Sequence, residues 1–267
     1  LFIAVLGFGL AGAAIATVCG EFIGGLFPIF YFSRENSSLL KLGRTKFNGS
    51  ILLKTCTNGS SELMTNLSSS VVNSLYNIQL LKFTGEDGVA AYGTIMYVSF
   101  IFVAIFIGYS IGSAPIISYN YGAKNAERVK KAFKLQTISC FAYAFILWAL
   151  IMLFPGMFVS IFTGDPALSE ITIWALRIYM ATIFMMGLQI SCQQTFIAFG
   201  NSKISAFLAV FRKIIVLIPL IYILPMILED DVFAVFLAEP IADVIAVATT
   251  VTLFYKEFKK LQQQMEA

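Results

Sequence analysis

Long apolar runs alternate with short polar connections along the chain. The longest uncharged run extends from Gly88 to Ala123, whereas about 20 apolar residues already suffice to cross the roughly 30 Å core of a bilayer. The pattern predicts a truncated first helix that ends near Phe8. It is followed by about seven full spans at residues 11–32, 59–81, 89–119, 138–162, 167–199, 204–228 and 232–255. The predicted fold class is therefore all-α, a polytopic bundle of transmembrane helices.

The polar connections alternate in charge. The basic ones are 33–57, 124–134, 200–203 and the tail from Lys256, and the acidic ones are 82–88, 164–170 and 229–231. Lys and Arg favour the cytoplasmic side of a membrane. We therefore expect a multi-pass protein of the cell (plasma) membrane, with the loop 33–57 and the C-terminus in the cytoplasm and the acidic turns outside. The amphipathic run 124–134 is expected to lie along the membrane surface.

Composition agrees with this pattern and narrows the function. The 267 residues are 58% hydrophobic and 12% charged, whereas an average soluble domain carries about 25% charge. There is no histidine, which excludes histidine-based triads and His-ligated metals. The four cysteines form no CxxC pair, so we expect neither a metal site nor a disulfide framework. No DDxxD motif occurs, and an enzyme is not expected.

Small and polar residues interrupt the second half of the longest uncharged run. Gly108, Gly112, Pro115 and Gly122 all fall between positions 108 and 122. Such residues either let two helices pack closely or loosen a helix that lines a transport cavity. Both interpretations stay open.

Two carboxylates lie deep in the last span. Glu239 and Asp243 are spaced i, i+4 on one helical face, and Asp243 follows Asp231 by the twelve residues that separate Arg177 from Asp165. At about 1.5 Å per residue, Asp243 and Arg177 therefore share a depth near the middle of the bilayer. Two such acids cannot both ionise freely without a cation. They predict either a coupling site for a proton or metal cation, or a structural ion pair with Arg177.

Other polar and aromatic residues within the spans are candidates for binding the cation or the substrate, and each also fits a purely structural role. Glu62, near the start of the second span, either binds a cation or complements the helix dipole, and Glu21 lies midway along the first. The residues that follow helical spacing and suit a substrate cavity are Asn66, Asn73, Asn77, Tyr92, Met96 and Tyr97. The asparagines are equally suited to hydrogen bonds between helices, and the other three to ordinary core or lipid-facing packing.

Five segments, in order along the chain, resemble the MATE (multidrug and toxic compound extrusion) family of cation-coupled efflux transporters. They are GAAIATV at 12–18, GEDGVAAYG at 85–93, GSAPIISYNYGA at 112–123, FGNSK at 199–203 and EPIAD at 239–243. The resemblance implies twelve helices in two six-helix lobes around a central cavity. On that plan residues 1–32 are a remnant of the N-terminal lobe (the end of helix five, then helix six) and 33–57 are the cytoplasmic inter-lobe loop. Residues 58–255 form the C-terminal six-helix lobe, and 256–267 a cytoplasmic tail.

The resemblance also implies a function. Because Leu1 begins inside an apolar run, we expect a fragment of a secondary active transporter that exports organic cations or drugs in antiport with H⁺ or Na⁺. One branch of the family binds the coupling cation on helices seven and ten. Here helix seven carries Glu62, whereas helix ten offers Gln189 and Gln193 as cavity candidates and no acid. Another branch uses an acid on helix one, so the coupling ion stays open.

The partners implied are the lipid bilayer, small organic or drug-like cations and the missing N-terminal lobe of the same chain. Glu21, on the first complete span, would face the other lobe. No nucleic acid and no cofactor besides the coupling ion are expected. Two alternatives remain: a flippase for lipid-linked saccharides, which shares the helix plan but needs a basic cavity, and a non-transporting membrane scaffold.

Overall fold

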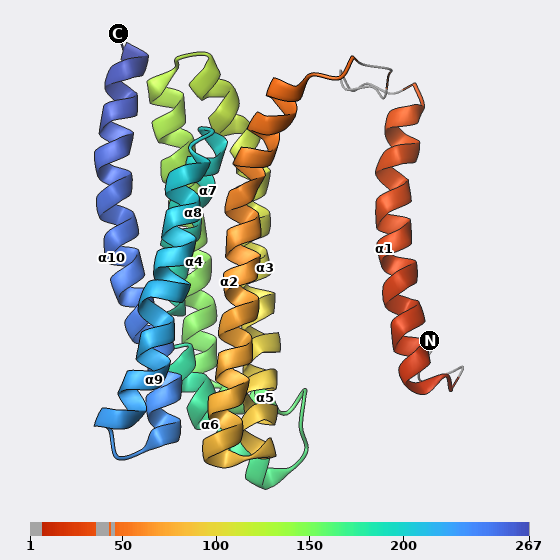
Figure 1. The fold of residues 1–267 in the computed structure, drawn as a ribbon, viewed down its shortest axis with the longest axis vertical. Coiled ribbons are helices and arrows are strands. Elements are labelled where there is room, and N and C mark those ends of the chain that lie inside the picture. The colour runs from red at the N-terminus through yellow and green to blue at the C-terminus, as the bar shows by residue number, and fades with distance from the viewer. Residues whose placement is uncertain (1–6, 36–42, 44–45, 267) are drawn as a thin grey trace. The chain divides into compact units, whose positions relative to one another are not determined.

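All regular secondary structure in the described part of the chain is helical (Figure 1). The structure is a computed structural model that describes residues 7–35, 43 and 46–266. The chain divides into two units, Leu1–Ser50 and Ile51–Ala267. The prediction of an all-α helix bundle is confirmed.

The first unit contains one long helix, α1 (Gly9–Ser33), which corresponds to the predicted span 11–32. Most of its side chains are exposed within the unit, including Glu21 at its middle. Residues 1–6, where we expected the end of an earlier helix, lie outside the described residues. So does most of the loop between 36 and 45.

The second unit contains six helical rods, some of them interrupted. Their elements are α2 (Gly49–Thr84), α3 (Glu86–Gly122), α4 (Ala126–Leu153), α5 (Pro155–Val159), α6 (Pro166–Tyr179), α7 (Ile183–Ala198), α8 (Ser202–Val210), the π-helix η1 (Phe211–Leu217), α9 (Ile218–Ile227) and α10 (Asp231–Glu266). Each rod corresponds to one predicted span from 59 onward. By length and apolar composition, five described helices including α1 are able to cross a membrane, or six if the bent pair α6 and α7 forms one span. The helix α2 does not pass that test, because serine and asparagine are frequent along it.

Three boundaries differ from those expected. The helix α2 already begins at Gly49, inside the predicted loop 33–57, and α10 continues through the predicted tail to Glu266. The run 124–134, expected to lie along the membrane surface, does not form a separate helix, because residues from Ala126 onward are the first turns of α4. The Asn125 side chain caps this helix by accepting a hydrogen bond from the backbone N–H of Arg128 at 3.1 Å. Such a cap satisfies one of the free amides that begin a helix.

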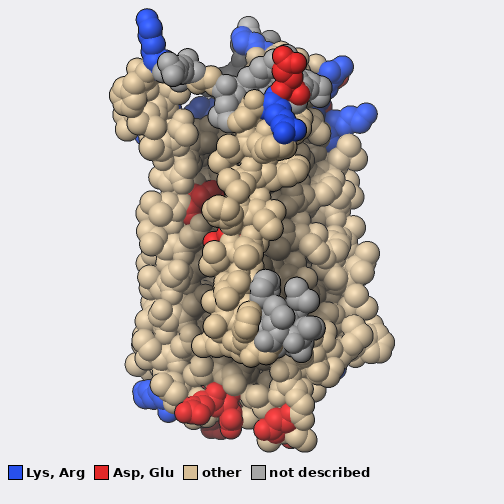
Figure 2. Space-filling view, turned by 90° about the vertical axis from the view of Figure 1, so that its right-hand side faces the viewer, with Lys and Arg blue, Asp and Glu red and all other residues tan. Residues whose placement is uncertain are grey.

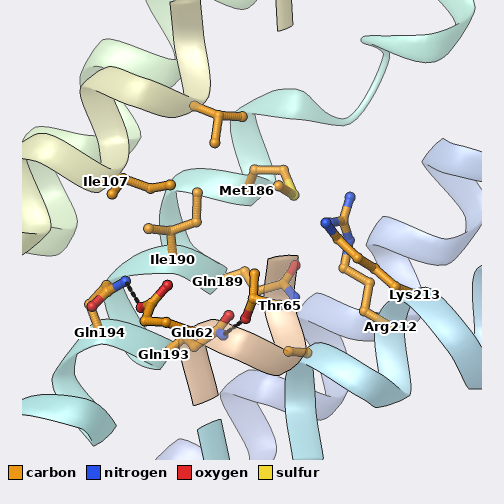
Figure 3. Close-up of a pocket in the computed structure, with 12 residues that line it drawn as sticks. Glu62, Thr65, Ile107, Met186, Gln189, Ile190, Gln193, Gln194, Arg212 and Lys213 are labelled. Atoms are coloured by element: carbon orange, nitrogen blue, oxygen red, sulfur yellow. Dashed lines mark hydrogen bonds between the residues drawn. The ribbon is translucent and has the colours of Figure 1, made fainter. Parts of the chain in front are cut away.

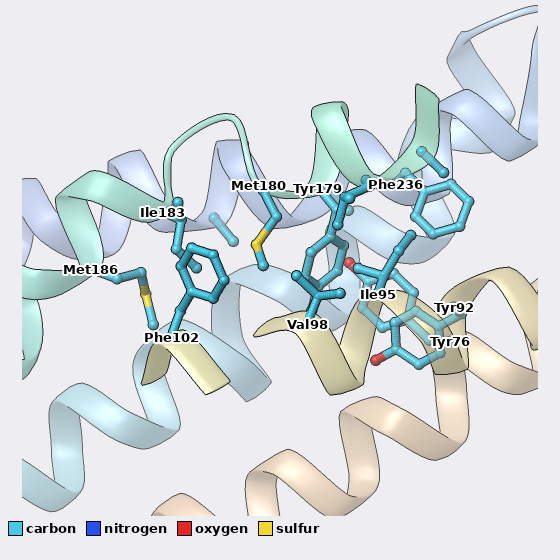
Figure 4. Packing of buried hydrophobic residues seen from close by; sticks show 14 of the residues in the cluster. Tyr76, Tyr92, Ile95, Val98, Phe102, Tyr179, Met180, Ile183, Met186 and Phe236 are labelled. Atoms are coloured by element: carbon cyan, nitrogen blue, oxygen red, sulfur yellow. The ribbon is translucent and has the colours of Figure 1, made fainter. Parts of the chain in front are cut away.

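The core of the second unit lies where α2, α3, α6, α7 and α10 meet (Figure 4). Tyr76 of α2 stacks on Tyr92 of α3, with ring centroids 4.8 Å apart, and Tyr179 of α6 contacts both rings edge-on. Elsewhere α4 and α7 approach closely. A Cβ at Gly187 would lie 3.0 Å from the carbonyl oxygen of Cys140, so a glycine is needed there.

The glycines singled out in the sequence have a different setting. A Cβ added at Gly108 or Gly112 would meet nothing within 4 Å, and both residues are exposed. Close packing through these two glycines is therefore not observed within the described residues. Their exposed face is available to line a cavity with a partner surface.

The up-and-down course of the rods separates the charges of the second unit. At one end lie the α3–α4 connection with Lys124, the α7–α8 connection with Lys203 and the last turns of α10 with Lys256. At the other end lie the connections that contain Asp165 and Asp230. In the space-filling view of Figure 2 most blue side chains lie toward the upper end and most red ones toward the lower end, although some red side chains also lie at the upper end and within the tan surface between. The alternation of charge along the sequence thus becomes a basic end and an acidic end.

Candidate functional site

A buried cluster of charges joins η1 to α10. The Arg212 guanidinium donates through Nε to Asp243 Oδ1 at 2.8 Å and through Nη2 to Glu239 Oε1 at 2.7 Å. All three residues are at most 7% exposed. Charged groups out of water are tolerated when they are paired and hydrogen-bonded, and this arrangement supplies both conditions.

The second oxygen of each carboxylate also has a partner. Tyr76 donates to Glu239 Oε2 at 3.3 Å, and Thr182 donates to Asp243 Oδ2 at 3.1 Å. Thr182 is available because the helix breaks between Tyr179 and Ile183, where α6 and α7 meet at a bend of 49°. A broken helix within a membrane requires such protein partners for its polar groups. The cluster therefore connects α2, the α6–α7 break, η1 and α10.

Lys213 brings a fourth charge to this region. It follows Arg212 in the π-helix η1, a form that often occurs at functional sites. Its ammonium donates a hydrogen bond to the Ser69 hydroxyl of α2, and it interacts electrostatically with both Glu239 and Asp243. Two basic and two acidic side chains therefore meet in this region.

One of the two predictions for Asp243, a structural ion pair with Arg177, is wrong. Arg177 is exposed on α6 and forms no salt bridge with the described residues, whereas Asp243 pairs with Arg212. Equal depth along two helices does not fix the direction in which their side chains point, and the Arg177 side chain is exposed.

A cavity of about 100 Å³ lies beside this cluster (Figure 3). Its polar wall comes from Glu62 and Thr65 of α2 and from three glutamines of α7, at positions 189, 193 and 194. The apolar wall is formed by side chains of α3 and α7, among them Ile107 and Met186, and the remaining side is closed by Arg212 and Lys213.

Glu62 is the carboxylate of this cavity, and it lacks a cationic partner among the described residues. Gln194 donates to Glu62 Oε1 at 3.1 Å, and Gln193 donates to Thr65 Oγ1 at 3.4 Å. The side-chain oxygen of Gln189 is buried without a hydrogen-bond partner in the described structure. Carboxylate and amide oxygens are ligands for hard cations, and a carboxylate also accepts a proton.

The other expected cavity residues do not line this space. Asn66 and Asn77 lie on the exposed face of α2, and Asn73 accepts a hydrogen bond of 2.9 Å from Tyr92. Tyr92 belongs to the core, being 2% exposed. The Met96 sulfur accepts a hydrogen bond from Tyr179 at 3.6 Å, and Tyr97 is exposed and stacks on Phe162.

Arg212, Lys213, Tyr76 and Thr182 of this cluster were not among the candidates from the sequence. Lys213 stands beside Arg212 within an otherwise apolar span, and two adjacent cations at that place were a usable signal. Thr182 gave no such signal, because neither glycine nor proline marks the break at 180–182. Glu21 of α1 belongs to the other unit, and its role stays a prediction.

The apolar helices and the charges buried between them define a multi-pass membrane protein. A protein-family model described as MatE matches residues 63–223, more than half of the chain, and the chain therefore belongs to the MatE family. The resemblance to the MATE family expected from its sequence segments is confirmed.

The curated relatives are proteins named multidrug export protein MepA. The chain is 25% identical over 229 residues to that of Staphylococcus haemolyticus (strain JCSC1435), covering 82% of this chain and 49% of the relative. It is 24% identical to that of Staphylococcus aureus (strain NCTC 8325 / PS 47), and the match covers 83% of this chain and 49% of the relative. The fold is that of a MATE protein solved in complex with MaL6, with a TM-score of 0.90 at 20% identity over 98% of this chain and 59% of that one. The chain thus spans about half the length of the curated relatives it matches.

Replacement of Arg212 by glutamine should strongly destabilise the second unit. Removing one partner of a buried ion pair leaves an uncompensated charge and costs about 3–5 kcal/mol in the free energy of unfolding. Arg177→Gln is the matched control, and it should change that free energy by less than about 0.5 kcal/mol because the residue is exposed. Thermal unfolding of the purified variants measures both, and equal melting temperatures for the two variants would contradict the assigned pairing.

Proposed function

We propose that the chain forms one lobe of a secondary active transporter that exports organic cations or drug-like molecules in exchange for H⁺ or Na⁺. The observation that carries the proposal is Glu62, a carboxylate that has no cationic partner among the described residues and lies at a polar cavity within a bundle of apolar helices. The names of the curated relatives, multidrug export proteins, support it. Since they are about twice as long as the matched region, a second lobe completes the cavity in this proposal.

The coupling ion binds at Glu62 in this account, and Glu239 and Asp243 have a structural role. Each carboxylate oxygen of Glu239 and Asp243 accepts a hydrogen bond, and the positive charges of Arg212 and Lys213 lie beside the two carboxylates. Glu62 receives a hydrogen bond from the neutral amide of Gln194 and forms no salt bridge with the described residues, so H⁺ or Na⁺ binds there without displacing a cationic side chain. The unpaired oxygen of Gln189 supplies a further ligand in the same cavity.

The organic cation competes for the same negative charge. Asn66 and Asn77 continue the exposed face of α2 away from Glu62 and offer polar contacts along it. When the ion occupies Glu62, the attraction for an organic cation falls, and when the ion leaves, that attraction returns. Mutually exclusive occupancy of one carboxylate is sufficient for antiport, provided that the two lobes alternate in access.

The flippase remains a second candidate because Arg212 and Lys213 both line the cavity. An anionic lipid-linked substrate would use Lys213, whose ammonium is bonded to the neutral Ser69 hydroxyl. The two candidates differ in the charge of the molecule carried. Movement of a phosphate-bearing lipid, with no effect of the protein on organic cations, would favour the flippase.

Glu62→Gln should abolish coupled export without unfolding the protein. Glutamine keeps the shape and the hydrogen bond with Gln194 but cannot take up a proton or balance Na⁺. The measurement is efflux of a fluorescent organic cation, such as ethidium, from efflux-deficient cells that express the full-length protein. Glu170→Gln, an exposed change of the same kind at the acidic end, should export normally. Normal ion-driven efflux by a well-folded Glu62→Gln variant would refute the coupling role.

We further propose that the basic end of the second unit, with the C-terminus, faces the cytoplasm of the cell. The excess of lysine and arginine at that end supports it. Cysteines introduced singly at Asp165 and Asp230 should react with a membrane-impermeant thiol reagent on intact cells, and those at Lys203 and Lys256 should not. Exposed Cys19 and Cys56 must first be replaced. The opposite labelling pattern would reverse the orientation.

A further inference from the structure

A second, larger cavity of about 660 Å³ lies between α4 and α10 at the basic end of the unit. Leu188 and Cys192 of α7 form its floor, a different face of α7 from Gln189 and Gln193. We call this space the α4–α10 groove. It shares no lining residue with the cavity at Glu62, so it is a separate feature of the fold.

The interior of the groove is apolar and aromatic. The Phe133 ring of α4 stacks on Phe254 of α10 with centroids 4.4 Å apart, and Phe258 stacks on Phe254 at 5.3 Å. Ile138 and Val251 extend the apolar lining along the two helices. Both are exposed, so the groove is accessible from outside the unit. These surfaces suit a flexible hydrocarbon chain.

The opening of the groove is positively charged. Lys130 and Lys134 are spaced i, i+4 on α4, and Lys259 stands opposite on α10. All three are exposed, and none forms a salt bridge within the described part of the chain. No acidic residue lines the groove. Three lysines around one opening repel an organic cation and attract an anion.

A buried hydroxyl adds a hydrogen-bonding group between the charged opening and the apolar floor. Thr137 lines the groove one turn beyond Lys134, and its Oγ1 is buried with no hydrogen-bond partner among the described residues. A buried polar group without a partner is uncommon, because it forfeits the hydrogen bond that water would provide. A ligand with an ester or phosphate oxygen at this level would satisfy it.

We propose that the α4–α10 groove binds an anionic phospholipid. One acyl chain lies along the apolar and aromatic lining of the groove, and an ester or phosphate oxygen accepts a hydrogen bond from Thr137. The headgroup phosphate is held by Lys130, Lys134 and Lys259. Basic pockets between transmembrane helices are suited to anionic headgroups, and long apolar chains are supplied by the same molecule. The proposal does not depend on export, because it concerns a different face of the bundle.

Binding of lipids to the purified full-length protein in zwitterionic detergent tests this assignment. Native mass spectrometry would compare phosphatidylglycerol with phosphatidylcholine of the same acyl chains. The triple variant Lys130→Gln/Lys134→Gln/Lys259→Gln should weaken phosphatidylglycerol binding at least about tenfold. The control triple Lys124→Gln/Lys203→Gln/Lys256→Gln removes the same charge from the same end outside the groove, and it should bind as the parent does.

A second variant tests the acyl chain. Val251→Trp narrows the groove at an exposed position that tolerates a larger side chain, and it should weaken lipid binding while the melting temperature is kept. Equal loss in both lysine triples, or equal binding of the two lipids by the parent, would overturn the proposal. Binding of glycerol phosphate as tight as that of the whole lipid would also overturn it, since a free phosphate would then be the ligand.

Discussion

The second unit depends on one constraint, which is that charges buried between membrane-spanning helices must be paired. Arg212, Glu239 and Asp243 meet this constraint together, and Tyr76 and Thr182 supply the remaining hydrogen bonds. Several irregular features serve the same cluster. The π-helix carries Arg212 and Lys213, and the break before α7 places Thr182 next to Asp243. Loss of one member would leave an unpaired charge that costs several kcal/mol, so these features are mutually dependent.

The helix α7 links this cluster to the cavity. It begins directly after Thr182, which binds Asp243, and two turns further on it carries Gln189, Gln193 and Gln194 at the cavity wall. Gln194 in turn holds Glu62 of α2. A paired cluster of charges lies at the start of α7, and the carboxylate of Glu62 lies beside the last turns of the same helix, at Gln194. Glu239 and Asp243 have a cationic partner in Arg212, whereas Glu62 has none among the described residues.

Much of the fold follows from the sequence. The alternation of apolar runs and charged connections predicted each rod of the second unit, because twenty-residue apolar runs have few alternatives in a membrane. The site was predicted less well from the sequence. Arg177 and Asp243 were paired because they share a depth in the membrane, but packing decides which side of each helix faces its neighbour. In the structure Arg212, not Arg177, lies against α10. Tyr92 had the spacing of a cavity residue and became core, because Tyr76 and Tyr179 cover its ring. The break at Thr182 carries no glycine or proline, so tertiary contacts rather than local preference create it.

The central claim is that the buried cluster is structural and that the coupling ion acts at Glu62. Ion-driven export by the quadruple variant Arg212→Met/Lys213→Met/Glu239→Gln/Asp243→Asn measures it most directly, because it removes both cations and both carboxylates of the cluster together and leaves none of them unpaired. The account predicts a folded full-length protein that still exports organic cations with the parent's dependence on the H⁺ or Na⁺ gradient. A well-folded quadruple variant whose export no longer responds to that gradient would contradict it.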